Sequence, residues 1–265
     1  MRILSVLAGV VFMGALATYG VGAYRSGTVS LIPAMNAVGV PMPAEVRESA
    51  EQRSPATSVE YKTGEGEGEI KRLVIGLDLS KSNPMITDSD YALKVAQRIS
   101  SMVKDLGFRS EVRVRTFGSF GGDENTFRFD ALVSSRYRPE KLAKELELLI
   151  GNTPTLVSRG TWQPQDRTNI IGFLENMAQV VDCNSMTTVY ILASDGLEES
   201  EYSNMKRQTS PLPHASGQFQ GCDELLILGL GQGTDSPTMT KRMRDQWQEW
   251  AQAAGFKRFS GLNDW

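Results

Sequence analysis

Residues 72–79 read RLVIGLDL, a nearly continuous apolar run that contains one carboxylate near its end. A run of this length is typical of a β-strand that is buried on both faces. Two similar runs follow, TTVYILA at 187–193 and ELLILGL at 224–230. Strands buried on both faces belong to parallel sheets, which helices must cover on each side.

The segments around these three runs have the spacing of such helices and of further strands. Helices are predicted at 90–106, 139–150, 169–181 and 240–254, and strands at 111–117, 127–133 and 258–260. The segment 127–133 carries Arg128 and Asp130, which favours an edge position. The alternation predicts an α/β fold with a doubly wound, mostly parallel sheet and helices on both faces.

The N-terminal quarter of the chain is predicted to lie outside this domain. A charged start and a long apolar run make residues 1–25 a signal peptide or a membrane anchor. Small-x-small sites at 15–17 and 21–23 would allow cleavage, whereas the length of the run, about 20 residues, favours a retained span. Residues 26–69 are rich in proline, small and charged residues and predict a disordered linker, which leaves 70–265 as the folded domain.

Either fate of the N-terminal run places the domain outside the cytoplasm, in the periplasm or at the cell surface. The formal net charge of −3 provides no basic surface for nucleic acid. His214 is the single histidine, which argues against a histidine zinc site or a Ser-His-Asp triad. Membrane contact is expected only through an uncleaved N-terminal segment.

Oxygen-bearing side chains follow two of the buried strands and precede one helix. Asp78, Ser80 and Ser82 alternate after the first strand, Asp195 follows the strand at 187–193, and Thr168 stands before the helix at 169–181. Because the carboxyl ends of parallel strands meet at one edge, we expect these five residues to converge there. Three hydroxyls and two carboxylates suit a hard cation, Mg²⁺ above all, or Mn²⁺ or Ca²⁺.

The pattern Asp78-x-Ser80-x-Ser82, then Thr168, then Asp195-Gly196 resembles the metal-ion-dependent adhesion site of von Willebrand factor type A (vWA) domains. The resemblance covers about residues 70–260. It implies a doubly wound sheet with one antiparallel edge strand, which the segment 127–133 would supply. It also implies that Ser80, Ser82 and Thr168 are direct metal ligands, and that Asp78 and Asp195 ligate directly or through water.

The function implied by this resemblance is metal-dependent binding of a protein partner, whose acidic residue completes the coordination of the ion. Two features depart from the family pattern: Asn83-Pro84 directly follows the motif, and the loop between Gly151 and Asp166 is long. Both are expected to alter the binding surface more than the metal site.

Three alternatives stay open on the sequence. A Mg²⁺-dependent phosphoryl-transfer or hydrolytic enzyme would use the same ion, although the sequence shows no clear phosphate-binding loop and no histidine near this edge of the sheet. A structural spacer would use the ion only to hold the loops together. Each residue also has a purely structural interpretation, with Thr168 as a helix cap and Asp195-Gly196 as a turn.

Two further motifs require an interpretation. The glycine-rich stretch at 229–233 follows a strand as a phosphate-binding loop does, but it lacks the G-x-G-x-x-G spacing and predicts a plain turn. Cys183 and Cys222 each precede a buried strand, and these two strands should be neighbours. We therefore predict a disulfide between them at the edge opposite the metal, with a stabilising role of about 2–4 kcal/mol.

Overall fold

The sheet of this protein is described by a computed structural model, in which residues 68–119, 127–207, 210–234 and 236–265 are placed. In these residues six strands form one sheet in the order β3-β2-β1-β4-β5-β6. The strands are β1 (Arg72–Asp78), β2 (Glu111–Phe117), β3 (Arg128–Leu132), β4 (Thr188–Ala193), β5 (Glu224–Leu228) and β6 (Arg258–Leu262). All neighbours are parallel except β2 and β3, which confirms the predicted sheet and its antiparallel edge strand.

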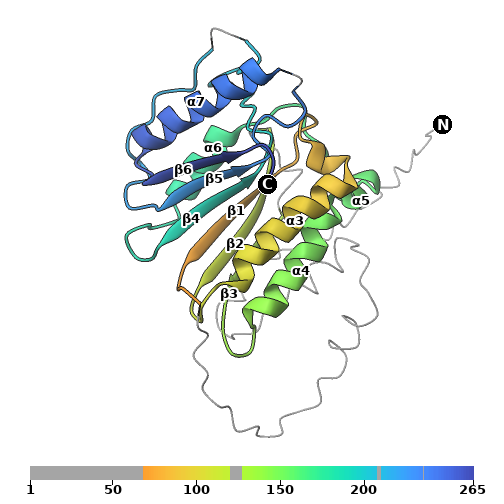
Figure 1. The fold of residues 1–265 in the computed structure, drawn as a ribbon, viewed down its shortest axis with the longest axis vertical. Helices are drawn as coiled ribbons and strands as arrows, with labels where there is room; N and C mark the ends of the chain where they lie inside the picture. Colours follow the sequence, from red (N-terminus) through yellow and green to blue (C-terminus); the bar gives the residue numbers. More distant parts are fainter. Residues whose placement is uncertain (1–67, 120–126, 208–209, 235) are drawn as a thin grey trace, which may run out of the picture.

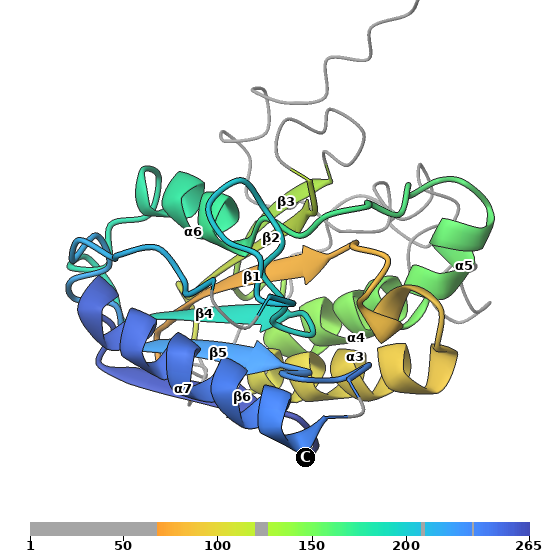
Figure 2. The same cartoon turned by 90° about the horizontal axis from the view of Figure 1, so that it is seen from above.

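Helices cover both faces of this sheet, as Figures 1 and 2 show. The helices are η2 (Pro84–Ile86), α3 (Ser89–Lys104), α4 (Pro139–Gly151), α5 (Thr153–Ser158), α6 (Ile170–Ala178) and α7 (Pro237–Ala254). One face carries α3, α4 and α5, and the other carries α6 and α7. The predicted long loop between Gly151 and Asp166 was wrong in part, because it contains α5. A helix of six residues is too short to show the periodicity on which the prediction depends.

The alternation of side chains along β1 divides the core into two layers. Leu73, Ile75 and Leu77 pack under α3 and α4, whereas Val74 packs under α6 and α7. Gly76 lies on the second side, where a Cβ would come within 2.7 Å of the Phe173 ring in α6. The glycine therefore allows α6 to lie close against the last residues of β1.

The two cysteines form the predicted disulfide. Cys183 precedes β4 and Cys222 precedes β5, so the bond joins two neighbouring strands at their amino ends. This edge is opposite the one where Asp78 and Asp195 lie.

Within the described residues we find no helix with the length and apolarity of a membrane span. The predicted signal or anchor at 1–25 and the linker at 26–69 lie almost wholly outside those residues.

Candidate metal centre

The last residue of β1 begins the site. Asp78 is fully buried, and its carboxylate Oδ1 accepts a hydrogen bond of 2.8 Å from the Ser80 amide. This short-range bond folds the chain back after the strand, as aspartate side chains do in turns. The hydroxyls of Ser80 and Ser82 then lie 3.2 Å apart. The structure thus brings these three predicted residues together.

The second carboxylate comes from the loop after β4. Asp195 is 3% exposed, and its Oδ1 accepts a hydrogen bond of 2.9 Å from the Leu197 amide. The Ser82 side chain acts to lower the pKa of this carboxylate, so the loop after β1 lies close to the loop after β4. Gly196 has a φ of 74°, so it supplies the left-handed conformation that the turn requires.

Ser194 is a member of this cluster to which the sequence alone assigned no role. Its hydroxyl donates a hydrogen bond of 2.6 Å to Asp78 Oδ2 and accepts one of 3.0 Å from the Gly196 amide. Its position directly before Asp195, at the carboxyl end of a buried strand, was the available signal. Both oxygens of Asp78 therefore already accept a hydrogen bond, which favours a water-bridged role for this carboxylate.

Backbone hydrogen bonds connect the segment around Thr168 to the loops that follow β1 and β4. The segment before it runs along the loop after β1, where the Gln165 amide donates to the Leu79 carbonyl and the Lys81 amide donates to the Gln165 carbonyl. On its other side, the Thr168 carbonyl accepts a hydrogen bond of 2.9 Å from the Glu199 amide. Among the described residues, however, the Thr168 hydroxyl forms no hydrogen bond to the other four predicted ligands. Its role as a ligand stays a prediction.

The electrostatics of the site are those of two buried carboxylates. Burial raises the pKa of Asp78 to about 7, and the charge of Asp195 adds to this increase. Burial likewise raises the pKa of Asp195 above its ordinary value. In the described part of the chain, no lysine or arginine forms an ion pair with either carboxylate. A cation between them would remove this unfavourable energy.

The donor set fits a hard ion. Hydroxyl and carboxylate oxygens are the ligands that Mg²⁺ and Mn²⁺ accept, and Mg²⁺ usually retains several waters. Across the described ranges no group of three or more histidine, cysteine, aspartate or glutamate side chains is gathered for a metal. A site here would depend on the serine and threonine hydroxyls as much as on the two carboxylates.

Asn83 is buried, whereas the sequence analysis assigned it to the binding surface. It was expected to alter the binding surface, but it is 1% exposed and packs behind the ends of β1 and β4. The expectation was wrong because a polar residue in a motif loop usually faces solvent. Here both functional groups of the amide have backbone partners.

Glu198 is another buried polar residue that the sequence did not single out. Its carboxylate accepts hydrogen bonds from the amides of Ile170 and Ile171, at 2.7 and 3.2 Å, and so caps the start of α6 next to Thr168. Burial raises its pKa to about 7, although these bonds and one from Ser200 act in the opposite direction. Glu198 fixes the helix on which the position of Thr168 depends.

The glycine-rich stretch at 229–233 is a hydrogen-bonded turn, as predicted. The amides of Gly229 and Leu230 donate to the Leu262 carbonyl, and the Gly231 amide donates to the Asp195 carbonyl. These three amides are therefore engaged inside the protein and do not point to a phosphate. The turn instead supports the loop that carries Asp195.

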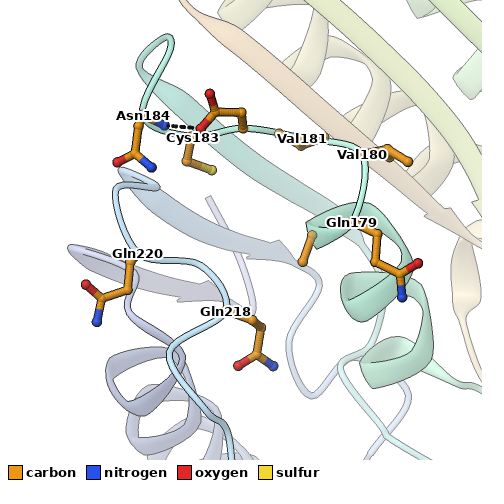
Figure 3. A pocket seen from close by; sticks show the side chains of 9 residues that line it. Gln179, Val180, Val181, Cys183, Asn184, Gln218 and Gln220 are labelled. Carbon is orange, nitrogen blue, oxygen red and sulfur yellow. Dashed lines mark hydrogen bonds between the residues drawn. The ribbon is translucent and has the colours of Figure 1, made fainter.

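A pocket of about 440 Å³ lies at the opposite edge of the sheet, beside Cys183 (Figure 3). The amide side chains of Gln179, Asn184, Gln218 and Gln220 line it. Asp182 and Cys183 also line it, and the Asp182 carboxylate accepts a hydrogen bond of 2.9 Å from the Asn184 amide. The pocket is thus separate from the candidate metal centre in place.

Comparison with known proteins gives similarity in fold only. No protein-family model matches the chain, and no curated protein matches its sequence. The pilus adhesin SpaC of Lactobacillus rhamnosus GG, in its open conformation, is 13% identical with a TM-score of 0.39 over 75% of this chain and 28% of its own. The manganese-loaded TRAP protein of Plasmodium vivax is 16% identical with a TM-score of 0.39, over 67% of this chain and 63% of its own.

A third solved structure is an aerotolerance-related membrane protein of Bacteroides fragilis that carries multiple mutations to serine. It is 17% identical with a TM-score of 0.39, over 73% of this chain and 92% of its own. This chain therefore spans less than a third of the adhesin and most of the aerotolerance-related protein.

Proposed function

We propose that this chain is a vWA-type binding domain that holds one divalent cation, most suitably Mg²⁺, and uses it to bind a protein partner. Ser80, Ser82 and Thr168 would ligate the ion directly. Asp78 and Asp195 would ligate it directly or through water. An aspartate or glutamate of the partner would then complete the coordination.

One observation carries this proposal: two buried carboxylates share a cluster of hydroxyls, and among the described residues neither forms an ion pair with a lysine or an arginine. The negative charge of Asp195 makes ionisation of Asp78 less favourable. Ser80 donates a hydrogen bond to Asp78, and Ser82 acts on Asp195. Such an arrangement destabilises the empty protein, and a divalent cation is the simplest group that would relieve it. Neutral hydroxyl ligands would leave the positive charge of the ion incompletely neutralised. One coordination position would then remain available to a carboxylate of the partner.

An extracytoplasmic location belongs to the same proposal. The Cys183–Cys222 disulfide is of the kind that persists in oxidising compartments. The apolar run at 1–25 would direct the domain there, as an anchor or as a cleaved signal.

The enzymatic alternative makes a different prediction at the same site. A phosphoryl-transfer enzyme would need groups that hold the phosphate, and the backbone amides of residues 229–232 already donate hydrogen bonds inside the protein. Substitution of Asp78 would abolish hydrolysis of a phosphate monoester under that alternative. Under the proposal it would abolish metal binding and partner binding together. A purely structural ion would instead give metal-dependent stability without any binding of a partner carboxylate in the wild type.

The test uses Mn²⁺ as a paramagnetic probe of the full domain. Water-proton relaxation should rise when Mn²⁺ binds, and should fall when an added carboxylate such as glutarate displaces a metal-bound water. Asp78→Asn should lose both effects, whereas Asp166→Asn, an exposed carboxylate paired with Lys81 beside the site, should keep them. Binding without a response to glutarate would refute the open position, and no binding would refute the metal centre.

A further inference from the structure

The Asn83 side chain connects the ends of the two strands that carry the acidic residues. Its Nδ2 donates to the Asp78 carbonyl at 2.8 Å and to the Ala193 carbonyl at 3.0 Å. Its Oδ1 accepts a hydrogen bond of 3.2 Å from the Met85 amide and so caps η2. The residue is 1% exposed, so water does not compete for these bonds.

The hydrogen bonds of Asn83 lie where the pairing between β1 and β4 ends. The last register pair between β1 and β4 is Leu77 with Ala193. Beyond this pair β1 continues to Asp78, which pairs with Phe117 of β2 instead. The Asn83 amide therefore connects β1 and β4 just beyond the end of their ladder. It binds the carbonyl of Asp78 itself on one side and the carbonyl two residues before Asp195 on the other.

We propose that Asn83 is a positioning residue that fixes the separation of Asp78 and Asp195 so that one divalent cation fits between their loops. The inference rests on the proposed metal centre. Asn83 itself touches neither carboxylate; it acts through the backbone carbonyls of Asp78 and Ala193. An asparagine is suited to this role because its amide nitrogen has two donors and its oxygen remains free to cap the helix.

A purely structural role for Asn83 predicts something different from a positioning role. If it only caps η2, any residue that keeps the cap should keep metal affinity. Serine is a good N-cap but offers a single, shorter donor that cannot serve both carbonyls. Asn83→Ser should therefore keep the cap of η2 and lose at least one of the hydrogen bonds to the Asp78 and Ala193 carbonyls.

A matched control is available at the other end of the sheet. Ser110 is also fully buried, accepts a hydrogen bond from the Lys71 amide and donates one to the Glu69 carbonyl. Ser110→Ala removes buried hydrogen bonds at the amino end of β2, remote from the acidic residues. It reproduces a general loss of stability without a change at the site.

The experiment is a Mn²⁺ titration followed by electron paramagnetic resonance of the free ion, with melting temperatures recorded in EDTA. Asn83→Ser should weaken Mn²⁺ binding by about 10- to 100-fold, the usual effect of a residue that orients metal ligands. Ser110→Ala should bind as the wild type does at an equal or lower melting temperature. Asn83→Thr serves as a second variant, since its hydroxyl also caps the helix and offers a single donor, and the same weakening is expected.

Wild-type affinity in either Asn83 variant would overturn the positioning role, whatever its melting temperature. Equal weakening in Ser110→Ala would also overturn it, because the effect would then reflect stability alone. If the wild type itself binds no Mn²⁺, the metal centre fails first and the inference fails with it.

Discussion

Ser194 donates a hydrogen bond of 2.6 Å to Asp78, from a position 116 residues away in the chain. The bond joins the loop after β4 to the end of β1, and both partners are almost fully buried. Ser194→Ala should lower the free energy of unfolding by about 1.5–3 kcal/mol, the usual range for a hydrogen bond to a charged group. Urea denaturation in EDTA measures this loss.

The control for that substitution is Ser158→Ala, which removes an exposed hydroxyl bonded to the Thr155 carbonyl. It should change the free energy of unfolding by no more than about 0.5 kcal/mol. Equal changes in the free energy of unfolding in the two variants would mean that the Ser194–Asp78 bond stabilises the protein no more than an exposed hydroxyl does.

Asp78→Asn should have opposite effects without and with metal. In EDTA the variant should be at least as stable as the wild type, because one of two mutually repelling buried charges is removed. With Mg²⁺ the wild type should gain about 2.7 kcal/mol at a free concentration near 100 times its Kd, and the variant should gain nothing. Differential scanning fluorimetry in EDTA and in MgCl₂ measures both; a metal-induced gain that persists in Asp78→Asn would contradict the site.

Glu198 should make the stability of the protein depend on pH. Burial raises the pKa of its carboxyl to about 7 in the folded state, from 4.5 in a free side chain. Below pH 4.5 both states are protonated, and between pH 4.5 and 7 only the unfolded state loses its proton. Stability should thus fall as pH rises through this window, by an amount on the order of 3 kcal/mol.

Glu198→Gln keeps the oxygen that caps α6 and removes this charge. The difference in unfolding free energy between pH 5 and pH 8, measured in EDTA, should be smaller than in the wild type. Glu140→Gln alters an exposed carboxylate on α4 and should leave the difference unchanged. A wild-type pH dependence in Glu198→Gln would show that the Glu198 carboxyl is not the group that titrates.

The disulfide should stabilise the fold without influencing the metal. Cys183 and Cys222 are separated by 39 positions, and their bond lies at the edge of the sheet opposite Asp78. The double variant Cys183→Ala, Cys222→Ala should lose about 2–4 kcal/mol of stability. Its Mn²⁺ affinity should equal that of the wild type, and a tenfold weaker affinity would show that the two edges are coupled.

The fold could be predicted because its main signals are local. Runs buried on both faces gave β1, β4 and β5, and helical spacing gave α3, α4, α6 and α7 within a few residues of their ends. The short helices η2 and α5 were not predicted, because segments of three and six residues are too short for a helical spacing of apolar residues to be recognised. Loop geometry depends on hydrogen bonds such as Gln165 to Leu79, which spacing alone does not reveal.

The candidate site could be predicted in outline and not in its supporting contacts. Asp78, Ser80, Ser82 and Asp195 converge because parallel strands end at one edge, which topology alone requires. The roles of Asn83, Ser194 and Glu198 were missed because some of their hydrogen-bond partners lie 27 to 116 positions away in the chain. A buried polar side chain is recognised only when the structure shows what it touches.

Calorimetric titration of Mg²⁺ into the wild-type protein, Asp78→Asn and Asp166→Asn tests the proposed centre most directly. We expect one ion per chain in the wild type and in Asp166→Asn, and no measurable binding in Asp78→Asn. Binding that survives in Asp78→Asn, or is absent from the wild type, would contradict a cation held between the loops after β1 and β4.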